Sequence, residues 1–151
     1  MTKSAKKLPV VIEICDYHEF DGESMSSEMM CDGMLEELPQ TDGGGWRIHY
    51  VEQAEGIKGS KSALRVQNRM VSLSRYGEFP LEITLEQGVR HNCYYHTPAG
   101  MMHLGVYART VDSSLTADGG SVKLHYTLDY FSEMMSSNRM EIFVHPIALR
   151  A

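Results

Sequence analysis

Hydrophobic and polar residues alternate with a period of two along most of the chain. The clearest example is VKLHYTLD, residues 122–129, in which every second side chain is apolar or aromatic. Successive side chains of a β-strand point to opposite faces, so this pattern predicts strands with one buried face. A helical period is almost absent. Similar runs occur at residues 10–15, 46–51, 64–67, 71–74, 81–86, 102–108 and 140–144.

Turn signals separate these runs, among them Asp21-Gly22, the Asp-Gly-Gly-Gly stretch 42–45, and Asp118-Gly-Gly. Short strands at this spacing, each with one apolar face, are typical of an antiparallel sheet closed around one interior. We therefore expect an all-β protein with an up-and-down antiparallel β-barrel of about 8–10 strands. Residues 26–38 would also suit a short helix, but the alternation of Glu28, Met30 and Asp32 favours a strand.

The chain length predicts one domain. Its 151 residues can bury a single sizeable core, so we assign residues 1–151 to one barrel domain. Lys3, Lys6 and Lys7 precede the first strand, and residues 1–8 are expected to form a flexible tail.

Composition narrows the classes of partner. The net charge is −6 and the basic residues are scattered, which argues against nucleic-acid binding. No apolar run is long enough for a membrane span. Three cysteines without CxxC spacing indicate a reducing compartment. We expect a cytoplasmic protein, monomeric or homodimeric, that binds neither nucleic acid nor membranes.

Several polar residues share the parity of the apolar ones and are predicted to face the barrel interior. Among them, Glu52 and Arg75 are the most informative, because a charge that faces a core is costly unless it is paired. The two can form an internal ion pair, or they can bind a polar ligand. Asp16 and His18 continue the first inward face toward the rim. The candidate ligand-binding residues are Tyr50, Glu52, Arg75, Tyr95, Thr97, Thr110 and Tyr126.

The stretch YYHTPAGMMHLGVYART, residues 94–110, is rich in reactive side chains. A turn at residues 98–101 would place His96 opposite His103 on the outer face, beside Tyr94 and Tyr107. Two histidines without a third ligand do not make a zinc site, so we predict no metal site. Cys15 and Cys31 are expected to lie opposite each other on the outer face as free thiols.

Enzyme signatures are missing from the sequence. It contains no GxGxxG, Walker, GxSxG or HExxH motif, and no pair of carboxylates is placed by spacing. We predict no cofactor and assign no catalytic residue. Whether the protein is an enzyme stays open, and the sequence favours a protein without catalytic activity.

A set of motifs resembles a known family. The set comprises Arg75-Tyr-Gly, Tyr95-His-Thr-Pro-Ala-Gly and Tyr126-Thr-Leu, with Thr110 between the last two. In order and spacing they resemble the YwiB-like bacterial proteins, a family of domains of unknown function, over roughly residues 10–144. Ala99 departs from the family, which commonly has an aromatic residue there. The resemblance implies a calycin-like, lipocalin-type barrel and no established activity.

Three hypotheses of function follow, in this order. The first is a small-molecule binder whose partly apolar ligand lies in the barrel interior. The second is a protein–protein interaction or homodimer module whose barrel is filled by its own side chains, many of them methionines. The third is an enzyme that uses Glu52 as base and a tyrosine as acid in the same interior.

Overall fold

Strands make up nearly all of the regular structure. The computed structural model describes residues 7–53, 57–78, 80–97, 99–131 and 133–147. Its elements are β1 (Lys7–Phe20), β2 (Glu23–Glu37), the short 3-10 helix η1 (Gln40–Asp42), β3 (Trp46–Val51), β4 (Lys61–Gln67), β5 (Met70–Tyr76), β6 (Leu81–Glu86), β7 (Arg90–Thr97), β8 (Gly100–Thr116), β9 (Gly119–Tyr130) and β10 (Glu133–Pro146).

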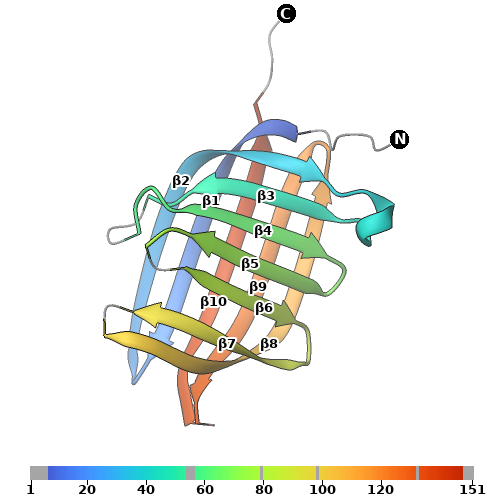
Figure 1. Cartoon of the computed structure of the whole chain (residues 1–151). Helices are drawn as coiled ribbons and strands as arrows, with labels where there is room; N and C mark the ends of the chain where they lie inside the picture. The colour runs from blue at the N-terminus through green and yellow to red at the C-terminus, as the bar shows by residue number, and fades with distance from the viewer. Residues whose placement is uncertain (1–6, 54–56, 79, 98, 132, 148–151) are drawn as a thin grey trace, which may run out of the picture.

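The ten strands form one closed barrel. Each strand pairs antiparallel with the next along the chain, and β10 returns to pair with β1 (Figure 1). Closure leaves neither terminal strand as an edge, which satisfies the backbone donors and acceptors of both. The predicted all-β, up-and-down antiparallel barrel is confirmed, as is the strand at residues 26–38.

Two long strands, β2 and β8, turn the corners of the barrel. β2 pairs with β1 along its whole length, and only its last residues, from Gly33 to Glu37, pair with β3. β8 pairs first with β7 and then with β9. In Figure 1 the strands β3 to β7 lie in front and cross the long strands behind them at a steep angle. At the β2 corner, a side chain on Gly33 would collide with the backbone of His49 and with Ile12.

The first strand begins earlier than expected. Lys7 and Leu8 already belong to β1, where Leu8 pairs with Leu35 of β2. The prediction of a tail is therefore wrong for these two residues, because pairing with β2 extends the strand beyond its apolar run. Residues 1–6 lie outside the described residues.

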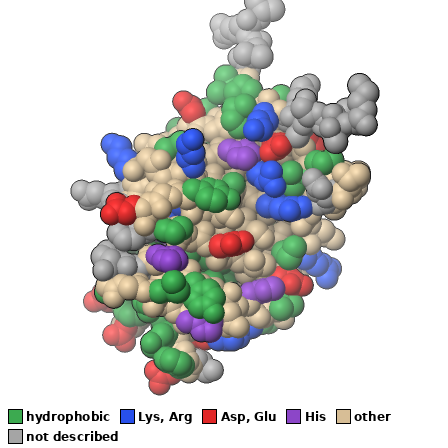
Figure 2. Space-filling model, viewed as in Figure 1, with side chains coloured by type: hydrophobic (Ala, Val, Ile, Leu, Met, Phe, Trp, Pro, Cys, Tyr) green, Lys and Arg blue, Asp and Glu red, His purple; other side chains and the backbone are tan. Residues whose placement is uncertain are grey.

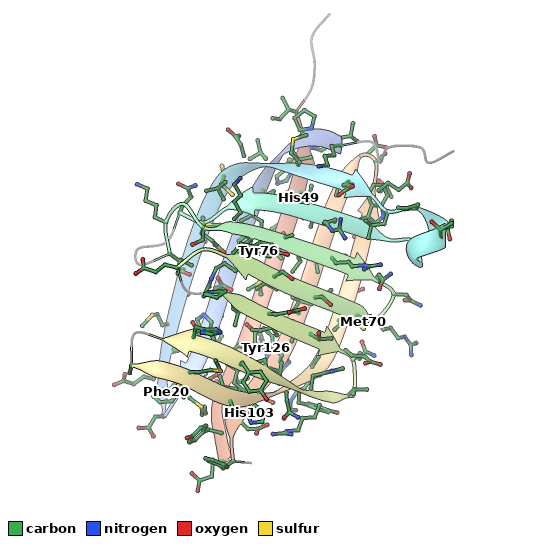
Figure 3. The ribbon with its side chains drawn as sticks, in the orientation of Figure 1. Phe20, His49, Met70, Tyr76, His103 and Tyr126 are labelled. Carbon is green, nitrogen blue, oxygen red and sulfur yellow. The ribbon has the colours of Figure 1, made fainter. Side chains whose placement is uncertain are left out.

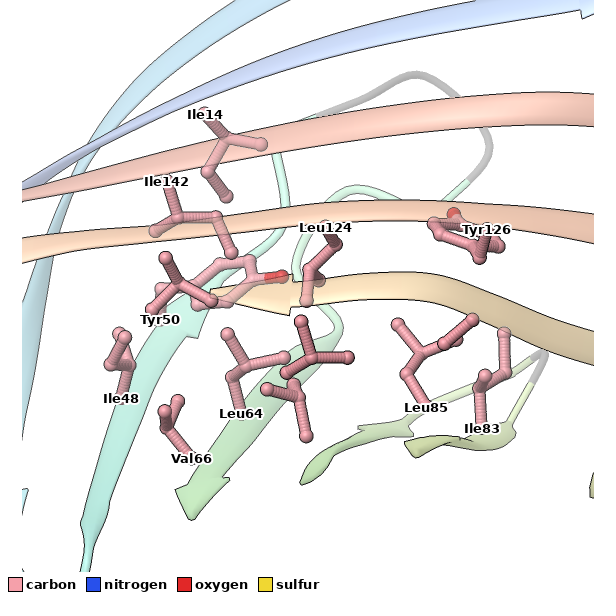
Figure 4. Close-up of a cluster of buried hydrophobic side chains, with 14 of the residues drawn as sticks. Ile14, Ile48, Tyr50, Leu64, Val66, Ile83, Leu85, Leu124, Tyr126 and Ile142 are labelled. Carbon is pink, nitrogen blue, oxygen red and sulfur yellow. The ribbon is translucent and has the colours of Figure 1, made fainter. Parts of the chain in front are cut away.

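The core fills the end of the barrel nearer the chain termini. Its most deeply buried side chains are aliphatic, and Figure 4 shows Ile48, Leu64 and Val66 packed with Ile142 and the ring of Tyr50. Burial of each such side chain stabilises the fold by about 1.5–3 kcal/mol. This end of the barrel is therefore closed by its own side chains.

The wall is weakest between β6 and β7. Among the described residues, Leu81 and Tyr95 are the one pair that joins these strands in the ladder. On its other side, β7 pairs with β8 over eight residues. An outer-face ion pair also anchors β7: Arg90 donates to both carboxylate oxygens of Asp129 at 3.0 and 2.7 Å, over Gly105. The strand is therefore held mainly from the β8 side, and we refer to the β6–β7 boundary as the seam.

Candidate functional site

A cavity of about 680 Å³ occupies the end of the barrel opposite the core. Five hairpins surround this end, and Phe20 lies at the tip of one of them (Figure 3). The wall nearer the core is apolar and includes Ile14, Leu73 and Ile83, whereas the polar lining gathers toward the mouth. The polar lining residues are Asp16, His18, Ser27, Glu28, Tyr50, Glu52, Gln53, Arg75, Tyr95, Tyr126, Ser136 and Asn138.

A row of inward side chains crosses five strands at the level of the cavity. Tyr50 on β3 is paired with Ser62, which is paired with Arg75 on β5. The row continues through Leu81 to Tyr95. Directly paired residues of neighbouring strands point to the same face, so the register alone brings these side chains to one wall. The predicted inward positions of Tyr50 and Arg75 are confirmed, since both are buried.

Glu52 follows directly after β3 and turns into the barrel. Its backbone N–H donates to the Ser60 carbonyl at 2.8 Å, which fixes the start of the loop. Its carboxylate accepts a hydrogen bond from the Ser62 hydroxyl at 2.7 Å, and the residue is 9% exposed. The inward position predicted for Glu52 is confirmed, and β4 supplies the group that holds it.

The opposite wall carries a second polar group, on β1 and β10. His18 and Asn138 are paired in register, and the His18 ring nitrogen Nδ1 hydrogen-bonds the Asn138 side-chain oxygen. The Asn138 amide also donates to Ser136 Oγ at 3.0 Å. Asn138 is 2% exposed and was not predicted. Extending the inward series of Met140 back by two residues along the strand would have found it.

Asp16 lies on the same wall, between Ile14 and His18 in the inward series. Its Oδ1 atom is buried and has no hydrogen-bond partner in the part of the chain that the structure describes. Burial raises the pKa of its carboxyl, the charge of Glu52 adds to this, and His18 acts in the opposite direction. The two carboxyl groups therefore interact across the cavity.

The same two carboxyl groups also affect the pKa values of two tyrosines, Tyr50 and Tyr126. Burial raises the pKa of Tyr126 well above its ordinary value, and Asp16 and then Tyr95 contribute further. Burial likewise raises the pKa of Tyr50, and Glu52 adds to it, while the hydrogen bond with Ser62 opposes the shift. Both hydroxyls therefore stay neutral at physiological pH and serve as hydrogen-bonding groups.

Thr110 does not face the interior. A β-bulge in β8 shifts the register between Ala108 and Thr110, so that Thr110 is exposed and Val111 is buried in its place. The prediction assumed unbroken alternation and is wrong for this residue, because the extra residue at the bulge reverses the parity. Tyr126 is buried and Tyr95 half-buried, as predicted. The side chain of Thr97 lies outside the described residues.

The β7–β8 hairpin is tighter than predicted. Thr97 pairs with Gly100, so His103 lies opposite Tyr94 instead of His96. The rings of Tyr94 and His103 stack with centroids 4.9 Å apart. The observed register differs from the predicted one by two residues, which keeps the described side chains on their predicted faces.

The two cysteines do not face each other. Cys15 is paired with Glu28 and Cys31 with Ile12, so that they lie on opposite faces of the wall. The prediction for the cysteines assumed a turn near Glu23, whereas the β1–β2 turn lies at residues 21–22. Both thiols are free. Cys31 is on the inner face and packs against the core. Burial raises the pKa of its thiol, and the charge of Glu52 adds to this.

Within the described ranges, no group of three His, Cys, Asp or Glu side chains is arranged to hold a metal ion. Nor do the described residues include a helix long and apolar enough to cross a membrane. The arrangement is a pocket with an apolar floor and hydrogen-bonding groups at its mouth, which is the usual construction of a small-molecule site.

The comparison with known families agrees with the fold. Residues 12–142 match the family described as Domain of unknown function (DUF1934). The chain belongs to this family. A solved structure of the same architecture is the crystal structure of ywiB protein from Bacillus subtilis, with a TM-score of 0.83 and 17% sequence identity. The alignment covers 95% of this chain and 96% of that one. No curated protein matches the chain.

Membership of the DUF1934 family confirms the resemblance seen in the sequence motifs. It adds no activity, because the family is defined by its domain alone. At 17% identity, the structural match shows the barrel and not the role of its lining. The function therefore has to be argued from the cavity.

Proposed function

We propose that this DUF1934 protein binds a small, partly apolar molecule in the open end of its barrel. The observation that carries the proposal is the cavity of about 680 Å³, with an apolar floor and polar groups at its mouth. This volume lies in the range of small-molecule sites, about 300–1,000 Å³. The sequence motifs imply a lipocalin-type barrel, and such barrels often bind small apolar molecules, so an analogy of fold supports the same proposal. We propose a cytoplasmic location for this binding, because three cysteines without CxxC spacing are typical of a reducing compartment.

The open cavity favours binding over a barrel that serves only as a scaffold. If the barrel were filled by its own side chains, the methionines would occupy the interior. Met29 and Met140 do line the cavity, but they leave the space between them open. Met25 and Met30, at 71% and 64% exposure, lie outside it.

The test is a titration with N-phenyl-1-naphthylamine, a neutral apolar dye whose fluorescence rises in apolar surroundings. We expect saturable binding to the native protein. Ile83→Trp replaces an aliphatic side chain of the cavity wall with the larger indole ring, and should weaken dye binding at least about tenfold. The matched control is Glu82→Trp, on the exposed face of the same strand. Far-UV circular dichroism verifies that both variants fold.

Two results would overturn this proposal. One is dye fluorescence that does not saturate with native protein. The other is equal binding by both variants, which would place the dye outside the barrel. Leu128→Phe, a smaller change on the opposite wall of the cavity, gives a second test if Ile83→Trp does not fold.

A second candidate function is self-association through the outer face of β7 and β8. Tyr94 and Met101 are 58% and 60% exposed there, beside His103 and Tyr107. Figure 2 shows hydrophobic and histidine side chains gathered over this part of the molecule. Sedimentation velocity tests the idea: a dimer that Tyr94→Glu converts to monomer supports it, and a monomeric native protein at high concentration excludes it.

A further inference from the structure

The charges in the cavity are not balanced, and the imbalance indicates the class of ligand. We propose that the cavity takes an organic cation, namely a protonated amine that carries an apolar body. The inference rests on the proposed binding function and adds the charge of the ligand to it. In this arrangement the ammonium group lies between Glu52 and Asp16, and the apolar body extends toward Ile83 and Leu128.

Glu52 is the first support. It is a carboxylate that is 9% exposed, and Ser62 is the one side chain that hydrogen-bonds it among the described residues. The Ser62 hydroxyl is neutral and engages only Oε2, so it leaves the second oxygen available at the cavity wall. A buried carboxylate binds most strongly to a charged donor, because the interaction is strengthened in surroundings of low polarity.

Asp16 is the second support and comes from the opposite wall. Its Oδ1 is buried without a hydrogen-bond partner among the described residues, although buried polar atoms are nearly always satisfied. The neighbouring donor, His18, has its Nδ1 committed to Asn138. A cation between the two walls would lie close to both carboxyl groups and offset the repulsion between Asp16 and Glu52.

Arg75 lines the same cavity and reduces the imbalance without removing it. Among the described lining residues, one guanidinium stands against the carboxyl groups of Asp16, Glu28 and Glu52, so the excess charge is negative. Arg75 itself already interacts with another residue of the protein. A carboxylate or phosphate ligand would gain from Arg75 but would add a further negative charge to the same cavity. The charge count therefore favours a cation over an anion.

The lining and the rim fit the same ligand. Tyr50, Tyr95 and Tyr126 surround the polar end, and aromatic faces attract cations. The tip of the β1–β2 hairpin beside the mouth carries exposed acidic residues, and Glu133 begins β10 at the neighbouring tip. Acidic residues at a mouth raise the local concentration of cations and speed their entry.

The experiment compares three ligands with the same ten-carbon chain: decylamine, decanol and decanoate. Each competes with N-phenyl-1-naphthylamine for the native protein, at about pH 8, where an unperturbed imidazole is neutral and the amine is charged. We expect decylamine to displace the dye at a concentration at least about tenfold lower than decanoate, with decanol between them.

Substitutions test which residues cause the preference for decylamine. Glu52→Gln and Asp16→Asn each remove one charge with little change of shape, and each should reduce the preference for decylamine over decanol about threefold or more. Glu141→Gln, on the exposed face of β10, removes the same charge outside the barrel and should leave the preference unchanged. The competition with native protein needs no variant, so the test survives a variant that does not fold.

The outcomes separate the two proposals. If the dye does not bind to native protein, the binding function itself fails. If the dye binds and decanoate competes as well as decylamine or better, the cation inference is overturned and the binding function stands. If decylamine is preferred but neither carboxylate variant changes the preference, its charge is recognised elsewhere and the inference is again overturned.

Discussion

Two buried carboxylates, Glu36 and Glu52, show how local neighbours decide what a charged residue does. Glu36 lies on the outer face of β2, where His49 hydrogen-bonds it at 2.9 Å and Arg47 lies 3.5 Å away. Figure 3 marks His49 on β3. Glu52 lies on the inner side of the wall and is held by the neutral Ser62 hydroxyl. The first carboxylate has a histidine and an arginine as structural partners, whereas the second lines the cavity.

Glu36 therefore gives a prediction for stability against pH. The hydrogen bond from His49 lowers the pKa of the Glu36 carboxyl, Arg47 adds to this, and burial opposes it. A pKa lowered by folding contributes stability that is present above the unfolded value, about 4.3, and is lost as the pH falls through the folded value. Glu36→Gln should cost about 0.5–1 kcal/mol near neutral pH, since His49 and Arg47 are partly exposed.

Urea unfolding of both proteins across the acid range measures this effect. The difference in unfolding free energy should shrink as the pH falls below about 4. Glu37→Gln, the exposed neighbour, serves as the control and should change little at any pH. A difference for Glu36→Gln that stays constant down to low pH would show that the charge of Glu36 does not stabilise the fold.

At the scale of the element, β8 and the seam depart from regular alternation. The bulge after Ala108 turns Val111 inward and Thr110 outward at the corner where β8 changes partners. A bulge bends a strand and increases its twist, which lets one strand serve both walls of the barrel. The seam interrupts the ladder on the other side of β7. The bulge lies where the barrel wall changes direction.

The bulge predicts opposite outcomes for two reciprocal substitutions. Val111→Thr places a hydroxyl in the core and should cost about 1–3 kcal/mol. Thr110→Val changes an exposed side chain and should stay within about 0.5 kcal/mol of the native protein. Thermal or urea unfolding measures both. Equal costs, or a larger cost for Thr110→Val, would contradict the assigned parity.

The seam predicts uneven protection of backbone amides. In the described part of the chain, Leu81 and Tyr95 are the single ladder pair between β6 and β7, so residues 82–85 have no paired partner among the described residues of β7. Their amides on that side should exchange with solvent faster than those of β4 and β9, which are paired on both sides. Native-state hydrogen exchange followed by NMR resolves this. Uniform protection across β4, β6 and β9 would mean that the seam is closed in solution.

At the scale of the whole molecule, closure joins strands from the two ends of the chain. β1 and β10 pair over ten residues, and the core draws side chains from every one of the ten strands. Removing any strand opens the barrel and exposes the shared core. The barrel is therefore expected to unfold as one cooperative unit.

Trp46, the one tryptophan of the chain, makes this testable. It begins β3 and packs against the core, while far-UV circular dichroism reports on all strands. The two signals should give the same urea midpoint. An earlier midpoint for Trp46 fluorescence would show that the β3 end of the barrel opens first and that closure does not couple the strands.

The sequence by itself determined the strands, the barrel and most of the inward positions. Alternation is local, so the parity of Tyr50, Arg75 and Tyr126 follows from the chain alone. The structure alone shows where alternation breaks, as at Thr110, because a bulge depends on how its strand pairs with the neighbouring strand. Packing across the barrel likewise determines the hydrogen bond from Ser62 to Glu52, the open cavity, and the buried Asp16 oxygen that has no partner among the described residues. No single strand carries that information.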